Sequence, residues 1–107
     1  MYFVFYNLEF IITFADEKQI SAKTKALVVV HLYGLICPEI EDIRDLCKEK
    51  DIFLIEDCAQ CLGAELNGTY AGGFGDFATF SFHAQKNLTT LGEGGMLKIR
   101  DEQLVNI

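Results

Sequence analysis

Two apolar runs with the character of strands flank a segment with the period of a helix in the first half of the chain. Residues 25–34 (KALVVVHLYG) form a continuous, β-branched run that ends at Gly34, and residues 52–57 (IFLIED) form a second run. Short apolar runs without a polar face are typical of strands that are buried on both sides. We therefore predict buried strands over residues 25–34 and 52–57.

The segment between these runs, residues 38–51, has the spacing of an amphipathic helix. Its apolar residues Ile40, Ile43, Leu46 and Cys47 fall on one helix face. Acidic residues gather in its first turn and lysines in its last turn, which suits the helix dipole. A strand, a helix and a strand in this order predict a βαβ unit with parallel strands and a right-handed crossover.

The second half of the chain has shorter elements separated by glycines. Its Asn-Gly pair is typical of a hairpin turn, and Asp101 suits the N-cap of a helix. A terminal helix of six residues is marginal alone, and the strands are too apolar for a sheet with open faces. We therefore expect an α/β fold with a mostly parallel sheet flanked by helices, incomplete at both ends. The predicted elements are a short helix or turn over 58–66, a glycine-rich turn over 67–76, strands over 77–82 and 94–100, and a helix after Asp101.

The first fourteen residues are mostly apolar and contain no lysine or arginine. A signal peptide begins with a positively charged region, which this segment lacks. A membrane span needs about 20 apolar residues, and this run is shorter and is interrupted by Asn7 and Glu9. We predict one or two buried strands here, with a degenerate signal sequence as the alternative.

Composition narrows the class of protein. The 107 residues suit one small globular domain, and the net charge is −7, from nine basic and sixteen acidic residues. No basic cluster is long enough to follow a phosphate backbone, so we expect neither nucleic acid nor a membrane as partner. The irregular spacing of Cys37, Cys47, Cys58 and Cys61 favours a reduced, cytoplasmic chain over a disulfide framework.

Candidate functional residues lie where the predicted parallel strands end. In open α/β sheets, functional groups gather at the carboxyl ends of such strands. His31, Glu56 and Asp57, and Lys86 occupy three of these ends. A converging Asp57 and Lys86 could form a structural ion pair. They could also form a pyridoxal phosphate site, in which a lysine binds the aldehyde and a carboxylate holds the ring nitrogen protonated.

The remaining motifs carry weaker signals. Cys58-x-x-Cys61 follows a predicted strand, which allows a redox pair, a zinc half-site or inert packing, and packing is the simplest interpretation. His31 and His83 lack the spacing of metal ligands, so no metal is expected. The glycines of residues 67–76 match neither common nucleotide-binding pattern. Residues 91–95 (LGEGG) suggest a close approach of backbones.

Residues 53–97 resemble the core of the DegT/DnrJ/EryC1/StrS family of pyridoxal phosphate-dependent sugar-nucleotide aminotransferases. The motifs E-D-x-A-Q, F-G-D, F-S-F-H-x-x-K-N and G-E-G-G occur in the family's order, and residues 24–34 resemble the strand before them. The match runs from about residue 21 to 105. It implies that residues 1–20 are a divergent N-terminal segment and that residues 21–107 are the central part of a fold-type-I cofactor-binding large domain.

The resemblance implies roles for four residues. Lys86 falls on the lysine that carries the cofactor as a Schiff base and then shuttles a proton. Asp57 falls on the partner of the pyridine nitrogen. Gln60 matches the residue beside the cofactor ring and its phenolic oxygen, and Ser81 a serine that contacts the phosphate. A dehydratase branch of the family has histidine in place of this lysine, so Lys86 favours transamination.

The implied reaction moves an amino group from glutamate to a nucleotide-linked keto sugar, in the biosynthesis of surface polysaccharides or aminosugars. Full-length relatives are expected to be cytoplasmic homodimers. The family's upstream glycine–threonine phosphate turn and its small C-terminal domain are missing from this sequence. Two alternatives therefore stay open beside the enzyme: an inactive remnant or partner-docking module of the family, and a small redox protein that uses Cys58 and Cys61.

Overall fold

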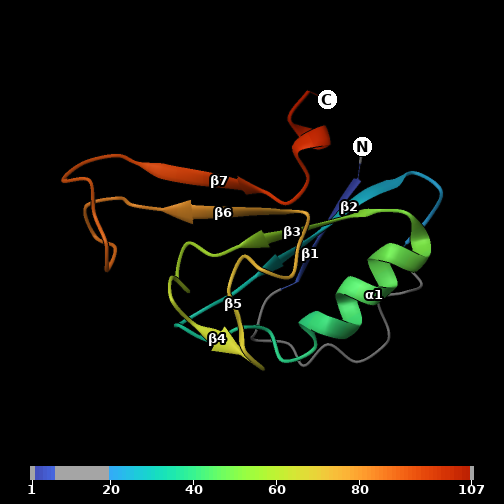
Figure 1. Cartoon of the computed structure of the whole chain (residues 1–107), viewed down its shortest axis with the longest axis horizontal. Helices are drawn as coiled ribbons and strands as arrows, with labels where there is room; N and C mark the ends of the chain where they lie inside the picture. Colours follow the sequence, from blue (N-terminus) through green and yellow to red (C-terminus); the bar gives the residue numbers. More distant parts are fainter. Residues whose placement is uncertain (1, 7–19, 107) are drawn as a thin grey trace.

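The computed structural model describes residues 2–6 and 20–106, which form a twisted sheet with one α-helix against it (Figure 1). The elements in chain order are β1 (Tyr2–Tyr6), β2 (Thr24–Val30), α1 (Ile40–Lys50), β3 (Phe53–Asp57), β4 (Glu65–Leu66), β5 (Thr69–Tyr70), β6 (Phe77–Ser81), β7 (Gly95–Ile99) and the 3₁₀ helix η2 (Glu102–Asn106).

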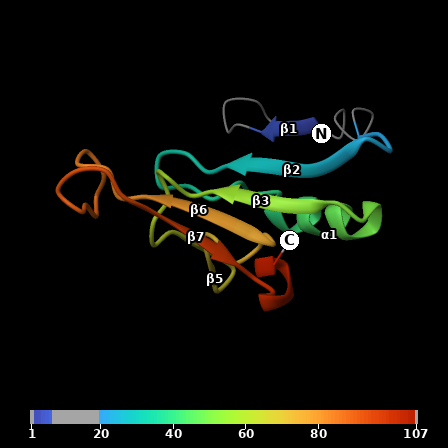
Figure 2. The same ribbon diagram turned by 90° about the horizontal axis from the view of Figure 1, so that it is seen from above.

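The main sheet has the order β1-β2-β3-β6-β7. Neighbouring strands from β1 to β6 run parallel, and β7 pairs antiparallel with β6. Figure 2 shows the parallel strands ending on one side, where the loop between β6 and β7 extends beyond the sheet. The parallel pairing of β2 and β3 confirms the predicted βαβ unit and brings the carboxyl ends of β2, β3 and β6 to one rim.

Helix α1 packs on one face of the sheet through its predicted apolar side. Ile40, Ile43 and Cys47 are buried there, and Leu46 is half-buried. The helix begins at Ile40 rather than at the predicted residue 38, and Asp51 ends it in the left-handed conformation. No helix in the described part of the chain is long and apolar enough to cross a membrane.

The core lies between the sheet and α1. Alternate residues of β2, β3 and β6 point into it, including Leu27, Val29, Leu54 and Ala78, and Phe74 completes it from the loop before β6. Hairpin β4–β5 lies on the same side as α1 (Figure 1). Within the described residues, no α-helix covers the opposite face, which we call the open face.

The open face is apolar away from the rim with Asp57 and Ser81. Residues that alternate with the core positions point to it, and Phe53 and Phe77 meet there edge to face with ring centroids 5.5 Å apart. Ile55 is half-buried, and the side chain of Leu97, opposite Thr79, is 57% exposed. Because parallel sheets are normally covered on both faces, this surface is suited to further polypeptide.

Several predicted boundaries need correction. Strand β2 ends at Val30 rather than Gly34, because Tyr33 and Gly34 adopt positive φ angles of 56° and 78° that no strand contains. Of the predicted helix or turn over residues 58–66, the turn is confirmed for residues 58–64, and β4 begins at Glu65. The predicted strand or strands at residues 1–14 are described only as β1, and residues 7–14 lie outside the described part of the chain.

Two local predictions are confirmed. Asn67 and Gly68 have φ angles of 50° and 80° between β4 and β5, as the Asn-Gly hairpin requires. The backbone N–H of Gln103 donates to Asp101 Oδ1 at 2.9 Å, so Asp101 caps the C-terminal helix, which is a 3₁₀ helix.

The F-G-D motif joins the start of β3 to the loop before β6. Phe74 is buried, and Asp76 exchanges hydrogen bonds with the backbone of Leu54: the Leu54 N–H donates to Asp76 Oδ2 at 2.9 Å, and the Asp76 N–H donates to the Leu54 carbonyl at 2.8 Å. A Cβ atom on Gly75 would lie 2.8 Å from the Leu54 carbonyl oxygen and 2.9 Å from that of Phe77. Only glycine therefore fits at this position.

We predict that Gly75→Ala destabilises the fold by about 1–3 kcal/mol, because two backbone carbonyls must move to admit the methyl group. Gly92→Ala is the matched control, since nothing lies within 4 Å of a Cβ atom there. Urea unfolding of the two variants should separate them clearly. Equal midpoints for both variants would contradict the close packing at Gly75.

Candidate functional site

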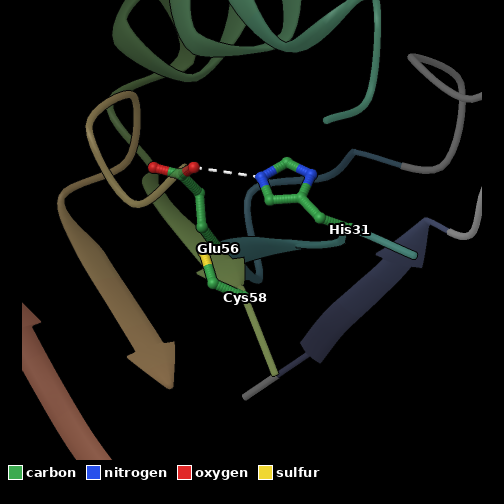
Figure 3. A group of neighbouring side chains, drawn as sticks. All are labelled: His31, Glu56 and Cys58. Atoms are coloured by element: carbon green, nitrogen blue, oxygen red, sulfur yellow. Dashed lines mark hydrogen bonds and ion pairs between the residues drawn. The ribbon is translucent and has the colours of Figure 1, made fainter. Parts of the chain in front are cut away.

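A buried carboxylate connects the strands on the core side of the sheet. Glu56 has no solvent-exposed surface, and His31 Nε2 lies 3.0 Å from its Oε2 atom (Figure 3). The backbone N–H of Gly72 donates to the same oxygen at 2.8 Å. The N–H groups of Phe74 and Gly75 donate to Oε1. Both carboxylate oxygens are therefore saturated with donors.

The hydrogen bonds of this pair determine the direction of the pKa shift of Glu56 and the tautomer of His31. Burial by itself raises the pKa of Glu56, but the hydrogen bonds from His31 and from the N–H groups of Gly75 and Gly72 outweigh it and hold the pKa below its ordinary value of 4.5. His31 Nδ1 accepts the backbone N–H of Cys37 at 3.2 Å. The ring proton therefore sits on Nε2, where it is donated to the carboxylate.

The glycine-rich loop over residues 72–75 is held from two sides. Glu56 accepts three of its N–H groups, as described above. From β7, Lys98 Nζ donates to the Gly72 carbonyl, and the next residue on that face, Arg100, donates to the carbonyls of Gly73 and Phe74. The carboxylate therefore binds the N–H ends of the peptide dipoles in this loop, and the two basic side chains bind their carbonyl ends.

His31, Glu56 and Cys58 are chemically suited to bind a metal, because their ligand atoms lie within 4.8 Å of one another. Their hydrogen bonds favour a structural role instead. Both ring nitrogens of His31 and both oxygens of Glu56 already have partners. Burial, followed by the charge of Glu56, raises the pKa of the Cys58 thiol and favours its protonated form.

The cysteines are free and buried. Burial raises the pKa of Cys37 to about 11 and that of Cys47 to about 12, and it also raises the pKa of Cys61. Buried thiols of this kind are inert. For Cys58 and Cys61, each 1% exposed, packing is thus favoured over the redox alternative.

A pocket of about 330 Å³ opens at the carboxyl rim of the sheet, beside the loop that follows β6. Its volume is in the range of small-molecule sites. Three of the residues predicted for the site, Gln60, Ser81 and Lys86, line it together. The other lining residues are Tyr33, Ala59, Leu62, Gln85, Asn87 and Leu88.

Lys86 reaches this pocket from a braced loop. Its backbone N–H donates to the His83 carbonyl at 2.9 Å, and the Phe82 N–H donates to the Gly94 carbonyl at 2.8 Å across the loop. His83 Nε2 lies 3.4 Å from a carboxylate oxygen of Glu93. These contacts hold the half-buried lysine at the rim of the sheet.

Asp57 lies next to the pocket but does not line it. Its Oδ1 atom accepts the N–H of Ala59, a lining residue, at 3.0 Å. Asp57 is paired with Thr79 in the sheet, so its side chain shares the open face with Ser81. No ion pair joins Asp57 to Lys86 among the described residues, which weighs against the structural alternative for these two residues.

Two predicted candidates, His31 and Glu56, lie in the core rather than at the rim. The sequence alone does not predict that these two residues pair, although a glutamate within an apolar strand indicates that it needs a buried partner. Tyr33 was missed as a pocket residue. Its N–H donates to Gln60 Oε1 at 3.4 Å, and the Gly34 N–H donates to the Gln60 carbonyl at 2.9 Å.

We predict that the free energy of unfolding falls as the pH drops below about 4.5. The lowered pKa of Glu56 in the folded state means that its contribution is present above the unfolded value and is lost as the pH falls through the folded value. Glu56→Gln should lower stability at neutral pH by about 1–3 kcal/mol for each stranded donor and flatten this acid dependence.

Chemical unfolding at a series of pH values measures both effects. Glu65→Gln, at an exposed position, is the control and should keep the profile of the parent chain. An unchanged acid limb in Glu56→Gln would show that another group causes it.

Comparison with known proteins places this geometry in a family. Residues 10–107 match the sequence model of the DegT/DnrJ/EryC1/StrS aminotransferase family. The chain is 49% identical over 88 residues to GDP-perosamine synthase of Escherichia coli O157:H7, covering 82% of this chain and 24% of that protein. It is 44% identical over 88 residues to a UDP-N-acetyl-3-dehydro-alpha-D-glucosamine 3-aminotransferase of Acidithiobacillus ferrooxidans, with the same coverage.

Solved structures of aminotransferases are also similar to this chain. Helicobacter pylori PseC, an aminotransferase involved in the biosynthesis of pseudoaminic acid, superposes with a TM-score of 0.77 at 38% identity, over 84% of this chain and 24% of that one. An aminotransferase from Psychrobacter cryohalolentis gives a TM-score of 0.74 at 42% identity, over 79% of this chain and 21% of that one. The chain thus spans about a quarter of the length of these relatives. It belongs to the DegT/DnrJ/EryC1/StrS aminotransferase family, whose aminotransferases depend on pyridoxal phosphate.

Proposed function

We propose that the pocket around Lys86 is the cofactor and amino-transfer site of a pyridoxal phosphate-dependent aminotransferase that acts on a nucleotide-linked keto sugar. The observation that carries this proposal is that Gln60, Ser81 and Lys86 line one pocket. Asp57 lies beside it and accepts a hydrogen bond from the lining residue Ala59. Support also comes from relatives whose names specify GDP-, UDP- and dTDP-linked sugars.

The residues of the pocket fit the groups of the cofactor. Bound pyridoxal phosphate supplies an aldehyde and an electron-accepting ring that stabilises negative charge on a substrate carbon. The Lys86 amine would hold the aldehyde carbon and move a proton to and from the substrate carbon. No described ion pair occupies that amine, so it is available for this role.

The other three residues would orient the ring. The Asp57 carboxylate would keep the ring nitrogen protonated, the Gln60 amide would lie by the phenolic oxygen, and the Ser81 hydroxyl would donate to the phosphate. The Gln60 amide oxygen accepts the Tyr33 N–H, which leaves its NH₂ group free to donate to an anionic oxygen. Each role uses hydrogen-bonding capacity that these side chains possess.

The finer features of the reaction belong to the same proposal. Glutamate is the proposed amino donor, surface polysaccharides or aminosugars the destination, and a cytoplasmic homodimer the proposed assembly. We further propose that residues 21–107 form the central part of the cofactor-binding large domain and that residues 1–20 are divergent. The match to the family model already begins at residue 10, inside that segment.

The open face favours a second candidate, a partner-docking or catalytically inactive member of the family. Leu97 and the pair of Phe53 and Phe77 present apolar surface there. The chain covers only 24% of PseC, so the occupant we propose is further polypeptide of the family's large domain. In this alternative, the chain binds other polypeptide through the open face, and the pocket catalyses no reaction.

We predict that pyridoxal phosphate added to the protein produces a visible absorbance band, and that borohydride reduction then fixes the cofactor on Lys86. Peptide mass mapping locates the modified lysine. Lys86→Ala should abolish the band and the adduct, whereas Lys48→Ala, which removes an exposed lysine of α1, should change neither. An adduct spread over several lysines, or one that survives Lys86→Ala, would contradict the proposed site.

Where no further polypeptide covers the open face, the docking alternative predicts that copies of this chain associate through it. Leu97→Lys should shift sedimentation toward the monomer, because it places a charge in an apolar contact. Leu91→Lys is the control, since Leu91 is 92% exposed in the loop between β6 and β7. If the parent chain sediments as a monomer that Leu97→Lys leaves unchanged, the open face does not drive association.

A further inference from the structure

The segment from Leu32 to Cys37 connects the buried pair of His31 and Glu56 to the pocket. At its base, the Cys37 N–H donates to His31 Nδ1 at 3.2 Å, in a buried position. At its tip, the N–H groups of Tyr33 and Gly34 donate to the side chain and backbone of Gln60. The segment is thus fixed at one end by the core and at the other by a pocket residue.

Tyr33 is held in an unfavourable state at the tip of this segment. Its φ angle of 56° lies in the left-handed region, which an aromatic residue rarely adopts. Its side chain is 76% exposed and lines the pocket, so packing in the core does not offset the strain. Strained backbone of this kind persists only where the surroundings enforce it, and it clusters at functional sites.

His31 provides the contact at the base of this segment, and Gln60 provides those at its tip. The His31 ring uses both nitrogens, with Nε2 donating to Glu56 and Nδ1 accepting from Cys37. Without the Nδ1 acceptor, the Cys37 N–H, at a residue only 4% exposed, would lose its partner, and the base of the segment would have to rearrange. Tyr33 would then be held in its strained conformation only by the contacts with Gln60 at the tip of the segment.

We propose that His31 is a positioning residue of the pocket, which acts through the Cys37 N–H to hold Tyr33 at the rim where the cofactor binds. This inference rests on the proposed function of the pocket. Glu56 fixes the orientation of the imidazole, and the imidazole fixes the segment. Neither residue touches the cofactor in this scheme, and the aromatic ring of Tyr33 supplies the contact.

Two substitutions separate the two hydrogen bonds of His31. Asparagine places an acceptor near the position of Nδ1, and glutamine places a donor near the position of Nε2. His31→Asn should therefore keep the bond from Cys37, and His31→Gln the bond to Glu56. Both variants lose one buried hydrogen bond, so their stabilities should fall by similar amounts.

The readout is the affinity for pyridoxal phosphate, titrated through the visible band of the Lys86 adduct under conditions where each variant is folded. His31→Gln should weaken binding roughly tenfold, the equivalent of one buried hydrogen bond, and His31→Asn should stay close to the parent chain. Ile43→Ala, in the buried face of α1, should lower stability without changing affinity.

Hydrogen exchange of the amides from Leu32 to Cys37 gives a second readout that needs no cofactor. His31→Gln should speed this exchange more than His31→Asn does. If the His31 variants fail to fold, Tyr33→Gly replaces them: it should raise the melting temperature by relieving the positive φ angle, and lower the affinity for pyridoxal phosphate by removing the ring.

The outcomes distinguish the two proposals. A parent chain without an adduct at Lys86 overturns the proposed function and this inference with it. A normal adduct with equal affinities in the parent chain, His31→Gln and His31→Asn overturns this inference alone. So does an equal loss of affinity in both His31 variants and Ile43→Ala, since that result indicates a purely structural role. In the replacement experiment, unchanged affinity in Tyr33→Gly overturns it.

Discussion

The carboxylate of Glu56 is the constraint on which the rest of the structure depends. A charged group without solvent exposure is tolerated only when hydrogen bonds replace its water, and here His31 and three backbone N–H groups do so. The donors come from His31, just after β2, and from the loop before β6. Strands β2 and β6 are the two neighbours of β3 in the sheet. One side chain of β3 therefore fixes its neighbours on both sides of the strand.

At the end of β3, the alternation of side chains separates the structural residue Glu56 from the candidate functional residue Asp57. Successive side chains of a strand point to opposite faces, so Glu56 enters the core and Asp57 turns to the open face beside the pocket. On the core side, Glu56 binds the N–H groups of the glycine-rich loop, while Lys98 and Arg100 bind its carbonyls. An anchor next to a candidate functional residue limits how far that residue can move.

Membership of the family explains why so small a chain carries this arrangement. The described residues match about a quarter of each solved relative at TM-scores above 0.7, so they reproduce a continuous part of a larger fold. That part contains the rim with Gln60, Ser81 and Lys86, together with an apolar face that parallel sheets normally cover. The chain therefore carries both the candidate site and an uncovered apolar surface, because it corresponds to this part of the family fold.

The sequence by itself determined the elements whose local period was strong. These are the two parallel strands, helix α1 with its buried face, the Asn-Gly hairpin and the cap at Asp101. It also determined, through the resemblance of its motifs, which residues to examine at the rim. Only the tertiary structure decided that His31 meets Glu56, that Tyr33 reaches the pocket and that residues 58–64 turn rather than form a helix. The physical reason is that local patterns report burial and backbone preference over a few residues, whereas the contacts of His31 with Glu56 and of Tyr33 with Gln60 join residues 25 or more positions apart.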